Sequence, residues 1–290
     1  MNSRDAFMLA CTLDVAVRKP GNVSMVSAGH RMQAQQFLAA AAAAAGPVTQ
    51  PGASVGARID AAMRASLAAA GCNTNLGIVL LAAPLARAAE TPGATRSMAA
   101  LADALAGVLG ALDVADASLA FAAIAHANPG GLGQAPEQDV HSAPELDLRA
   151  AMALAADRDR IAWQYTKGFA DVLELAGGLR VAGVPRPGLQ AHAPDAATTA
   201  AVQRVFVECL GRWPDSHIVR KHGAAVAQTV LHAAQRWRER PAPDTDPDFA
   251  AWDISLKSAG LNPGTSADLT VAALFTAALL GEGPGQWHGT

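Results

Sequence analysis

The sequence predicts an all-α fold, a single-domain bundle (residues 1–290) in which two buried helices occupy the centre. Three observations favour it. The chain is 51% hydrophobic but only 4% aromatic, and its core residues are chiefly Ala, Leu and Val, of which alanine is the strongest helix former. Ile59, Met63 and Leu67 recur at helical spacing. Two uncharged apolar segments, 78–86 and 269–281, each follow a polar turn, as expected of helices that are apolar on every side.

The first half of the chain alternates apolar helical segments with turns rich in Gly and Pro. Pro20 and Gly21 end the first helix, and an alanine run continues the second. Pro84 would kink the first buried helix or tighten it against a neighbour. The expected helices cover 3–18, 30–45, 57–70, 78–86, 96–110 and 114–127, with a loop at 46–56 and a linker at 90–96.

The second half begins with an irregular stretch, 128–146, that carries four acidic or histidine side chains. Its glycines follow no strand and precede no Gly-Lys-Ser/Thr, so a P-loop is excluded. Residues 147–175 read as one long helix, on which Asp159, Trp163 and Lys167 would share a face. Further helices are expected at 198–210 and 216–238, then a linker at 241–249, a short helix and the helix 269–281, while the tract 177–194 joins two halves.

Charge and cysteine content restrict the function. A net charge of −3 argues against nucleic-acid binding through bulk electrostatics. The three cysteines are widely spaced, which fits a reducing cytosol. We expect neither a signal peptide nor a membrane span, because charges interrupt the apolar runs. HExxH and GxSxG are both absent. A cytoplasmic protein is expected, with a homo-oligomer possible.

The turn 19–24, Lys-Pro-Gly-Asn-Val-Ser, is a candidate phosphate site. Lys19 would supply a mobile cation beside exposed backbone N–H groups and the polar side chains of Asn22 and Ser24. The same composition also suits an ordinary loop. A second candidate is the basic stretch 215–223, where Arg220 and Lys221 could hold a polyphosphate or belong to a solvated surface.

Two further turns precede the buried helices. Residues 71–77 and 261–268 are rich in Asn, Thr and Gly. A buried helix whose N-terminus opens into a cavity presents unpaired N–H groups to an anion. Thr265 and Asp268 also fit a capping box. Both turns are polar and lead into an apolar helix, which suggests one shared polar pocket. Asp268 would either cap its helix or face a ligand there.

Taken together, these motifs resemble those of the triphosphoribosyl-dephospho-CoA synthase family, which carries KPG, NT-x-x-G and PG-x-SADL signatures. The match spans about Ala6 to Leu280 and includes 19–24, 73–77, 220–223 and 262–268 in order. The resemblance implies an all-helical transferase. Its reaction joins ATP to 3′-dephospho-CoA, releases adenine and forms 2′-(5″-triphosphoribosyl)-3′-dephospho-CoA, with nucleotides as the small-molecule partners.

The resemblance also implies roles for particular residues. Asp268, with Asp159 as second choice, would be the catalytic base or a Mg²⁺ ligand. Lys19 and the Asn22 turn would take phosphates, while Asn73 and Asn75 would hold ribose or base. The candidate substrate- and phosphate-binding residues are Lys19, Gly21, Asn22, Ser24, Asn73, Thr74, Asn75, Arg220, Lys221, Asn262, Gly264, Thr265 and Ser266.

Two positions depart from the family pattern. Arg31 and Ala57 stand where family members often carry an acid, and losing these carboxylates would weaken metal binding. The match looks closer to the branch found with one-carbon cofactor genes. Alternatives are therefore an enzyme of the same fold acting on another phosphorylated substrate in methanopterin or methylofuran metabolism, and a non-catalytic helical binding protein.

Overall fold

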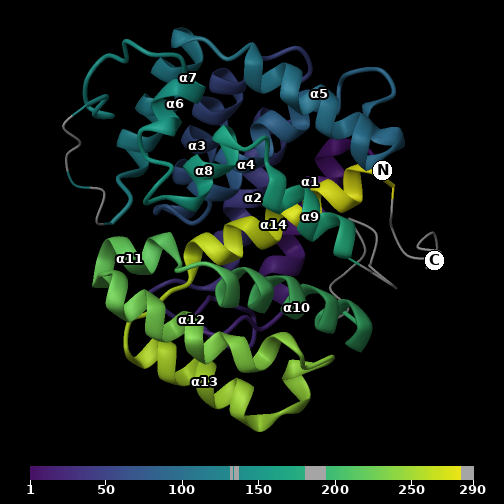
Figure 1. Cartoon of the computed structure of the whole chain (residues 1–290), viewed down its shortest axis with the longest axis vertical. Coiled ribbons are helices and arrows are strands. Elements are labelled where there is room, and N and C mark those ends of the chain that lie inside the picture. Colours follow the sequence, from purple (N-terminus) through teal and green to yellow (C-terminus); the bar gives the residue numbers. More distant parts are fainter. Residues whose placement is uncertain (131–132, 134–136, 180–193, 282–290) are drawn as a thin grey trace.

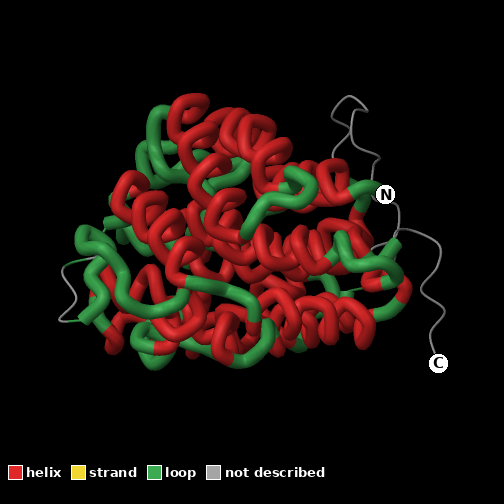
Figure 2. The backbone as a smooth tube through the Cα atoms, turned by 90° about the horizontal axis from the view of Figure 1, so that it is seen from above, coloured by secondary structure: helices red, strands yellow, loops and turns green. Residues whose placement is uncertain are grey.

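The computed structural model describes residues 1–130, 133, 137–179 and 194–281, and everything below refers to these residues. They form helices joined by turns, and no strand occurs among them. Figure 2 shows this from above, with red helices and green connections. The predicted all-α class is confirmed.

A first group of helices surrounds α4 (Leu76–Ala88) in the upper part of Figure 1. α2 runs through Pro47, so the loop expected at 46–56 is shorter than predicted. The bounds are α2 Ala34–Val48, α3 Val55–Ala70, η1 Ala94–Arg96, α5 Met98–Gly110, α6 Val114–Ala127, α7 Leu148–Ala153 and α8 Arg160–Thr166.

A second group forms the lower part of Figure 1 around a smaller core. Trp237 and Phe249 meet edge to face in this core, with ring centroids 5.0 Å apart. The expected linker at 241–249 includes a short 3₁₀ turn and the start of a helix. The bounds are α10 Ala196–Arg212, α11 Ser216–His222, α12 Ala224–Arg238, η2 Pro243–Thr245 and α13 Pro247–Ser258.

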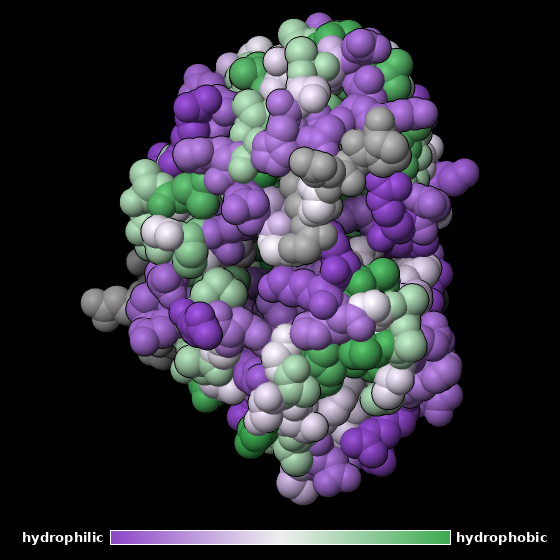
Figure 3. All heavy atoms as spheres, turned by 90° about the vertical axis from the view of Figure 1, so that its left-hand side faces the viewer, coloured by the Kyte–Doolittle hydropathy of each residue, from purple (hydrophilic) through white to green (hydrophobic). Residues whose placement is uncertain are grey.

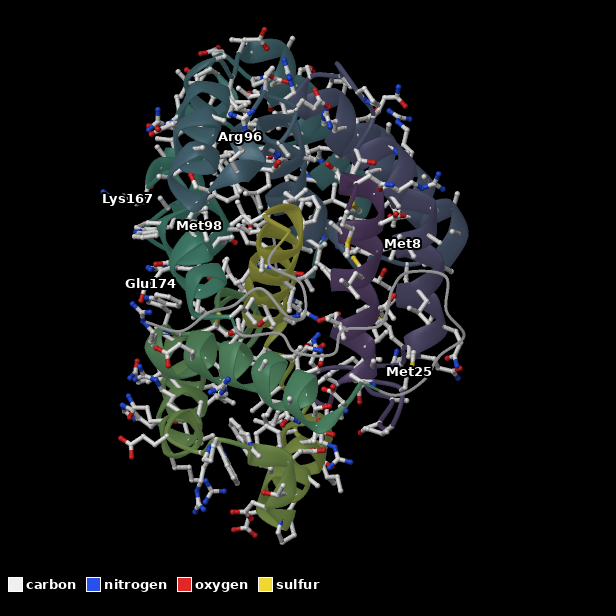
Figure 4. The ribbon with its side chains drawn as sticks, turned by 90° about the vertical axis from the view of Figure 1, so that its right-hand side faces the viewer. Met8, Met25, Arg96, Met98, Lys167 and Glu174 are labelled. Carbon is white, nitrogen blue, oxygen red and sulfur yellow. The ribbon has the colours of Figure 1, made fainter. Side chains whose placement is uncertain are left out.

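The central helix is α14 (Gly264–Leu279), which packs on α1 (Ser3–Ala16), α4, α9 (Ala170–Gly178) and α10. Figure 4 shows it between α1, which carries Met8, and α9, which carries Glu174. From Thr265 onward its residues are buried, except Asp268, which is half-buried. α4 is buried in the same way. Both helices predicted to be central and buried are therefore confirmed.

The long helix predicted at 147–175 is wrong, because the chain forms three short helices there, α7, α8 and α9. Asp159 accepts hydrogen bonds from the backbone N–H groups of Ile161 and Ala162 and so starts α8. Gly168 and Phe169 both have positive φ, near +60°, and separate α8 from α9. Asp159 therefore caps a helix rather than sharing a face with Lys167, which is exposed and points outward in Figure 4.

Two other predictions about helix ends are also wrong. The helix expected at 216–238 breaks at Gly223, whose φ of 88° suits glycine and divides it into α11 and α12. No side chain of α14 caps its own first turn, so Thr265 and Asp268 do not form a capping box. Asp215, the residue that precedes α11, accepts from the backbone N–H of Ser266 instead.

No single helix among the described residues combines the length and the apolar composition of a span, and only α5 and α6 taken together, bent by 93°, meet both criteria. The tract predicted to join two halves, 177–194, lies mostly outside the described residues.

Candidate functional site

A cavity of about 690 Å³ lies where α4, α8, α11 and α14 begin. Helix α11, which lines it, lies on the left of Figure 1. Figure 3 views this side and shows hydrophilic residues around the middle of the molecule. Apolar side chains, among them Phe37, Phe121 and Ile124, line another part of the cavity. The site thus offers both polar and apolar surfaces to a ligand.

Asp268, in the first turns of α14, faces this cavity and lies against the beginning of α4. A Cβ atom built on Gly77 would come 2.0 Å from Asp268 Oδ2, so only glycine permits this approach. Burial, followed by the neighbouring carboxylates of Asp14, Asp215 and Asp159, raises the pKa of Asp268 well above its usual value. A carboxyl group whose pKa is raised takes up a proton more readily than an exposed one, as a general base requires.

Asp215 joins the beginnings of α11 and α14. One of its carboxylate oxygens accepts from the backbone N–H groups of His217 and Ile218, at 3.0 and 3.1 Å. The other accepts from both the N–H and the hydroxyl of Ser266, each at 2.8 Å. The backbone N–H of His217 also donates to Thr265 Oγ1. Ser266 therefore has a partner within the protein, and it does not line the cavity.

The basic side of the cavity comes from α11. Arg220 donates to Asp159 Oδ2 at 3.1 Å, so the acid at the start of α8 is ion-paired. Lys221 is exposed and lines the cavity, as does Arg220. The cations that we predicted for a polyphosphate therefore do reach the cavity, together with Asp159.

The turn before α4 supplies three neutral polar residues to the cavity wall. Asn73 Oδ1 accepts from the N–H of Leu76. Asn75 donates to Ser66, but its Oδ1 has no partner, and neither does Thr74 Oγ1. All three predicted residues of this turn, Asn73, Thr74 and Asn75, therefore line the cavity.

The turn at 19–24 differs from its prediction. Lys19 is fully buried, with its ammonium 3.0 Å from Asp14 Oδ1, so it is not a mobile cation and does not line the cavity. The turn packs against 261–263, because a Cβ on Gly21 would meet Pro263 at 2.7 Å. Ser24 is buried away from the cavity. Only Asn22 reaches the cavity wall, where it donates to Asn262.

The remaining candidates of the last turn lie where they were expected. Asn262, Gly264 and Thr265 all line the cavity with Asp268. Of the predicted binding residues, Lys19, Gly21, Ser24 and Ser266 do not. Lys19, Gly21 and Ser266 are instead bonded to Asp14, Asp253 and Asp215.

Asp14 and His217 are two of the lining residues that the sequence analysis did not propose. Asp14 stands on α1 between buried neighbours and contacts Lys19, and an acid within an apolar stretch was the signal available for it. Its pKa is raised by burial and lowered in part by Lys19. His217 appeared in the sequence only as one of eight scattered histidines.

Unsatisfied polar atoms concentrate at this cavity. Buried polar atoms normally find hydrogen-bond partners, so orphans point to an absent ligand or water. The lining side-chain atoms without a hydrogen-bond or ion-pair partner are Asn22 Oδ1, Thr74 Oγ1, Asn75 Oδ1 and His217 Nε2.

The two departures from the family pattern lie elsewhere. Arg31 is exposed in the turn 29–32, and Ala57 is in α3, where the adjacent Gly56 packs on Asp116; neither lines the cavity. The absence of acids there removes no carboxylate from the cavity wall. Among the described residues, no group of three His, Cys, Asp or Glu side chains is arranged to hold a metal ion.

The chain matches a known protein family over nearly its whole length. The model of CitG, ATP:dephospho-CoA triphosphoribosyl transferase, matches residues 2–286. The chain belongs to this family. The CitG-family assignment confirms the resemblance drawn from the four motifs, and it makes the protein a transferase of the triphosphoribosyl group.

A solved structure supports the fold of this CitG-family chain. It is described as "putative triphosphoribosyl-dephospho-coA synthase from Archaeoglobus fulgidus", with a TM-score of 0.64 and 23% identity. The match covers 84% of this chain and 98% of that one. No curated protein matches the chain.

Proposed function

We propose that the cavity binds ATP and that its residues transfer the triphosphoribosyl group to the hydroxyl of a second nucleotide, with 3′-dephospho-CoA as the acceptor. The observation that carries this is the juxtaposition in one cavity of Asp268, the cations of α11 and four unpaired polar atoms. The family match supplies the reaction class.

The reaction is a substitution at the anomeric carbon of ribose. The acceptor oxygen bonds to this carbon as its bond to adenine breaks, and the carbon carries positive charge in between. We propose that Asp268 takes the proton from the acceptor hydroxyl. We also propose that the negative charge of its carboxylate stabilises the oxocarbenium-like state. Adenine leaves with the bonding electrons and gains a proton, which balances the proton that the acceptor hydroxyl gave to Asp268.

Phosphate binding is assigned to the α11 side of the cavity. Arg220 and Lys221 provide the positive charge there, and Asp159 orients Arg220 through their ion pair. Asn73, Thr74 and Asn75 would hold ribose or base, the last two with their unpaired oxygen atoms. The apolar wall would exclude water that could hydrolyse the activated sugar.

The donor set is compatible with Mg²⁺. This ion is usually held by one or two carboxylates together with substrate phosphates, so it needs no cluster of three acidic ligands. Asp268 and Asp159 both face the cavity and would supply the carboxylates. The ion would neutralise phosphate charge. Titration with Mn²⁺ in the presence and absence of ATP, followed by electron paramagnetic resonance, would test this ligation independently of turnover.

The decisive assay is chromatographic detection of adenine released from ATP, with dephospho-CoA and other ribosyl acceptors offered separately. Release with dephospho-CoA, abolished in Asp268→Asn, is expected. Release that requires a different acceptor would assign the chemistry but reject this substrate. No release with any acceptor would reject the proposal, and the control His232→Asn, an exposed change on α12, must behave as wild type.

We also propose that residues 1–290 form one domain. One family model extends over 2–286, and α14 contributes to both hydrophobic clusters, through Ala267 to the smaller and through Leu269 onward to the larger. Calorimetry of the full chain would test this, because one domain is expected to unfold in a single transition.

A further inference from the structure

One face of α11 is directed at the cavity. His217, Arg220 and Lys221 follow each other at i, i+3 and i+4, and all three line the cavity. Arg220 is paired with Asp159, whereas Lys221 has no ion-pair partner within the described part of the chain. This face therefore presents positive charge on either side of one imidazole ring.

The tautomer of His217 follows from its neighbour. Nδ1 lies 3.5 Å from Nη2 of Arg220, and a guanidinium group can only donate. Nδ1 must then accept, which leaves the ring proton of a neutral imidazole on Nε2. Burial first, and then the charges of Lys221 and Arg220, lower the pKa of His217 to about 3, so the ring is neutral at physiological pH.

The other ring nitrogen has no partner. Nε2 is buried and is one of the four unpaired atoms at the cavity. The position of the residue does not depend on the ring, because Asp215 and Thr265 both accept from its backbone N–H. The fold thus holds a neutral N–H donor without using it.

We propose that His217 donates its Nε2–H to a phosphate oxygen of the bound nucleotide, in a subsite completed by Arg220 and Lys221. The proposal rests on the proposed function for the identity of the nucleotide. Phosphate is favoured over the base because the two flanking cations on the same helix face attract an anion. A neutral donor adds a directed hydrogen bond without adding charge.

Two amide substitutions separate this role from a structural one. Gln at position 217 can place its amide N–H near the position of Nε2, whereas Asn reaches only as far as Nδ1, where it can accept from Arg220. A phosphate donor therefore predicts rescue by His217→Gln and none by His217→Asn. A residue that merely positions Arg220 predicts the reverse.

Calorimetric titration of the full chain with Mg-ATP, tripolyphosphate and adenosine would test the assignment. We expect His217→Asn and His217→Ala to weaken ATP and tripolyphosphate binding about tenfold or more, as loss of a charge-assisted hydrogen bond does. His217→Gln should stay within about threefold of wild type, and adenosine binding should not change. His232→Asn, which alters an exposed histidine bonded only to Gln228, is the matched control.

Each contrary result has a distinct meaning. Equal affinities in wild type and His217→Asn, or rescue by Asn instead of Gln, would overturn the inference while leaving the transferase proposal intact. Loss confined to adenosine would place the histidine at the base and also overturn it. Wild-type protein that binds tripolyphosphate normally but releases no adenine would reject the proposed function and not the subsite.

Discussion

The close approach of Asp268 to α4 leads to a sharp prediction for Gly77. A Cβ at this position would lie 2.0 Å from Oδ2, 2.5 Å from Cγ of Asp268 and 2.7 Å from Ile161 Cδ1. Ordinary contacts begin at 3.4 Å, so the carboxylate must retreat by about 1.4 Å in Gly77→Ala. A displacement of about 1 Å in a catalytic group can reduce the rate about 100-fold.

We therefore expect Gly77→Ala to lower kcat for adenine release by about 100-fold or more, equivalent to about 2.7 kcal/mol in the activation barrier. The unfolding free energy should change less, because the gain in helix propensity, about 1 kcal/mol, offsets part of the overlap. Steady-state kinetics with chromatographic detection, beside a urea titration, would measure both quantities.

Gly107→Ala is the matched control. Gly107 lies in α5, and a Cβ there meets nothing within 4 Å. This variant should gain up to about 1 kcal/mol in stability and retain wild-type turnover. In an Asp268→Ala background, Gly77→Ala should cause little further loss, since the displaced carboxylate is already absent. Turnover of Gly77→Ala within about threefold of wild type would refute the placement of Asp268 as the catalytic carboxylate.

Three further predictions concern buried charge. Lys19→Met should lower the unfolding free energy by about 3–5 kcal/mol in denaturant titration, because it strands the carboxylate of Asp14; an unchanged midpoint would contradict the buried pair. Because the fold raises the pKa of Asp268, its ionised form destabilises the protein as the pH rises above the pKa of this group in the unfolded chain. Asp268→Asn should therefore have a higher Tm than wild type at pH 7, and the difference in Tm should vanish near pH 3. A lower Tm of the variant at pH 7 would contradict the raised pKa of Asp268. The fold lowers the pKa of His217 from 6.5 to about 3. The contribution of the neutral ring to stability is therefore complete above pH 6.5 and declines as the pH falls toward 3. Wild type should then be about 2 kcal/mol less stable relative to His217→Gln at pH 5 than at pH 8, and pH-independent differences between the two would refute this.

The sequence determined the helical class, the two central helices and the family. Alanine-rich composition and apolar periodicity act over a few residues, so they indicate helices wherever these lie in the fold. The turns before α4 and α14 could be recognised in the same local way. Asn73, Asn75 and Asp268 were thereby placed correctly at the cavity.

Helix ends were less predictable from local pattern. The segment 147–175 carries enough helix formers for one long helix, yet Asp159 caps a new helix in its middle and two residues of positive φ interrupt it again. These breaks follow from packing, because the start of α8 is also held by a hydrogen bond from the N–H of Arg160 to Ser216.

Tertiary structure alone decided which polar residues face the cavity. Lys19 looked like an exposed cation, but the fold buries it against Asp14, while the turn that follows it is fixed by a bond from the N–H of Gly21 to Asp253, 232 residues away. The ion-pair partner of Asp159 likewise comes from α11, and one acceptor of the His217 backbone N–H comes from α14. A side chain is buried or exposed by whatever segment packs on it, and contacts so distant along the chain leave no local periodicity from which they could be predicted.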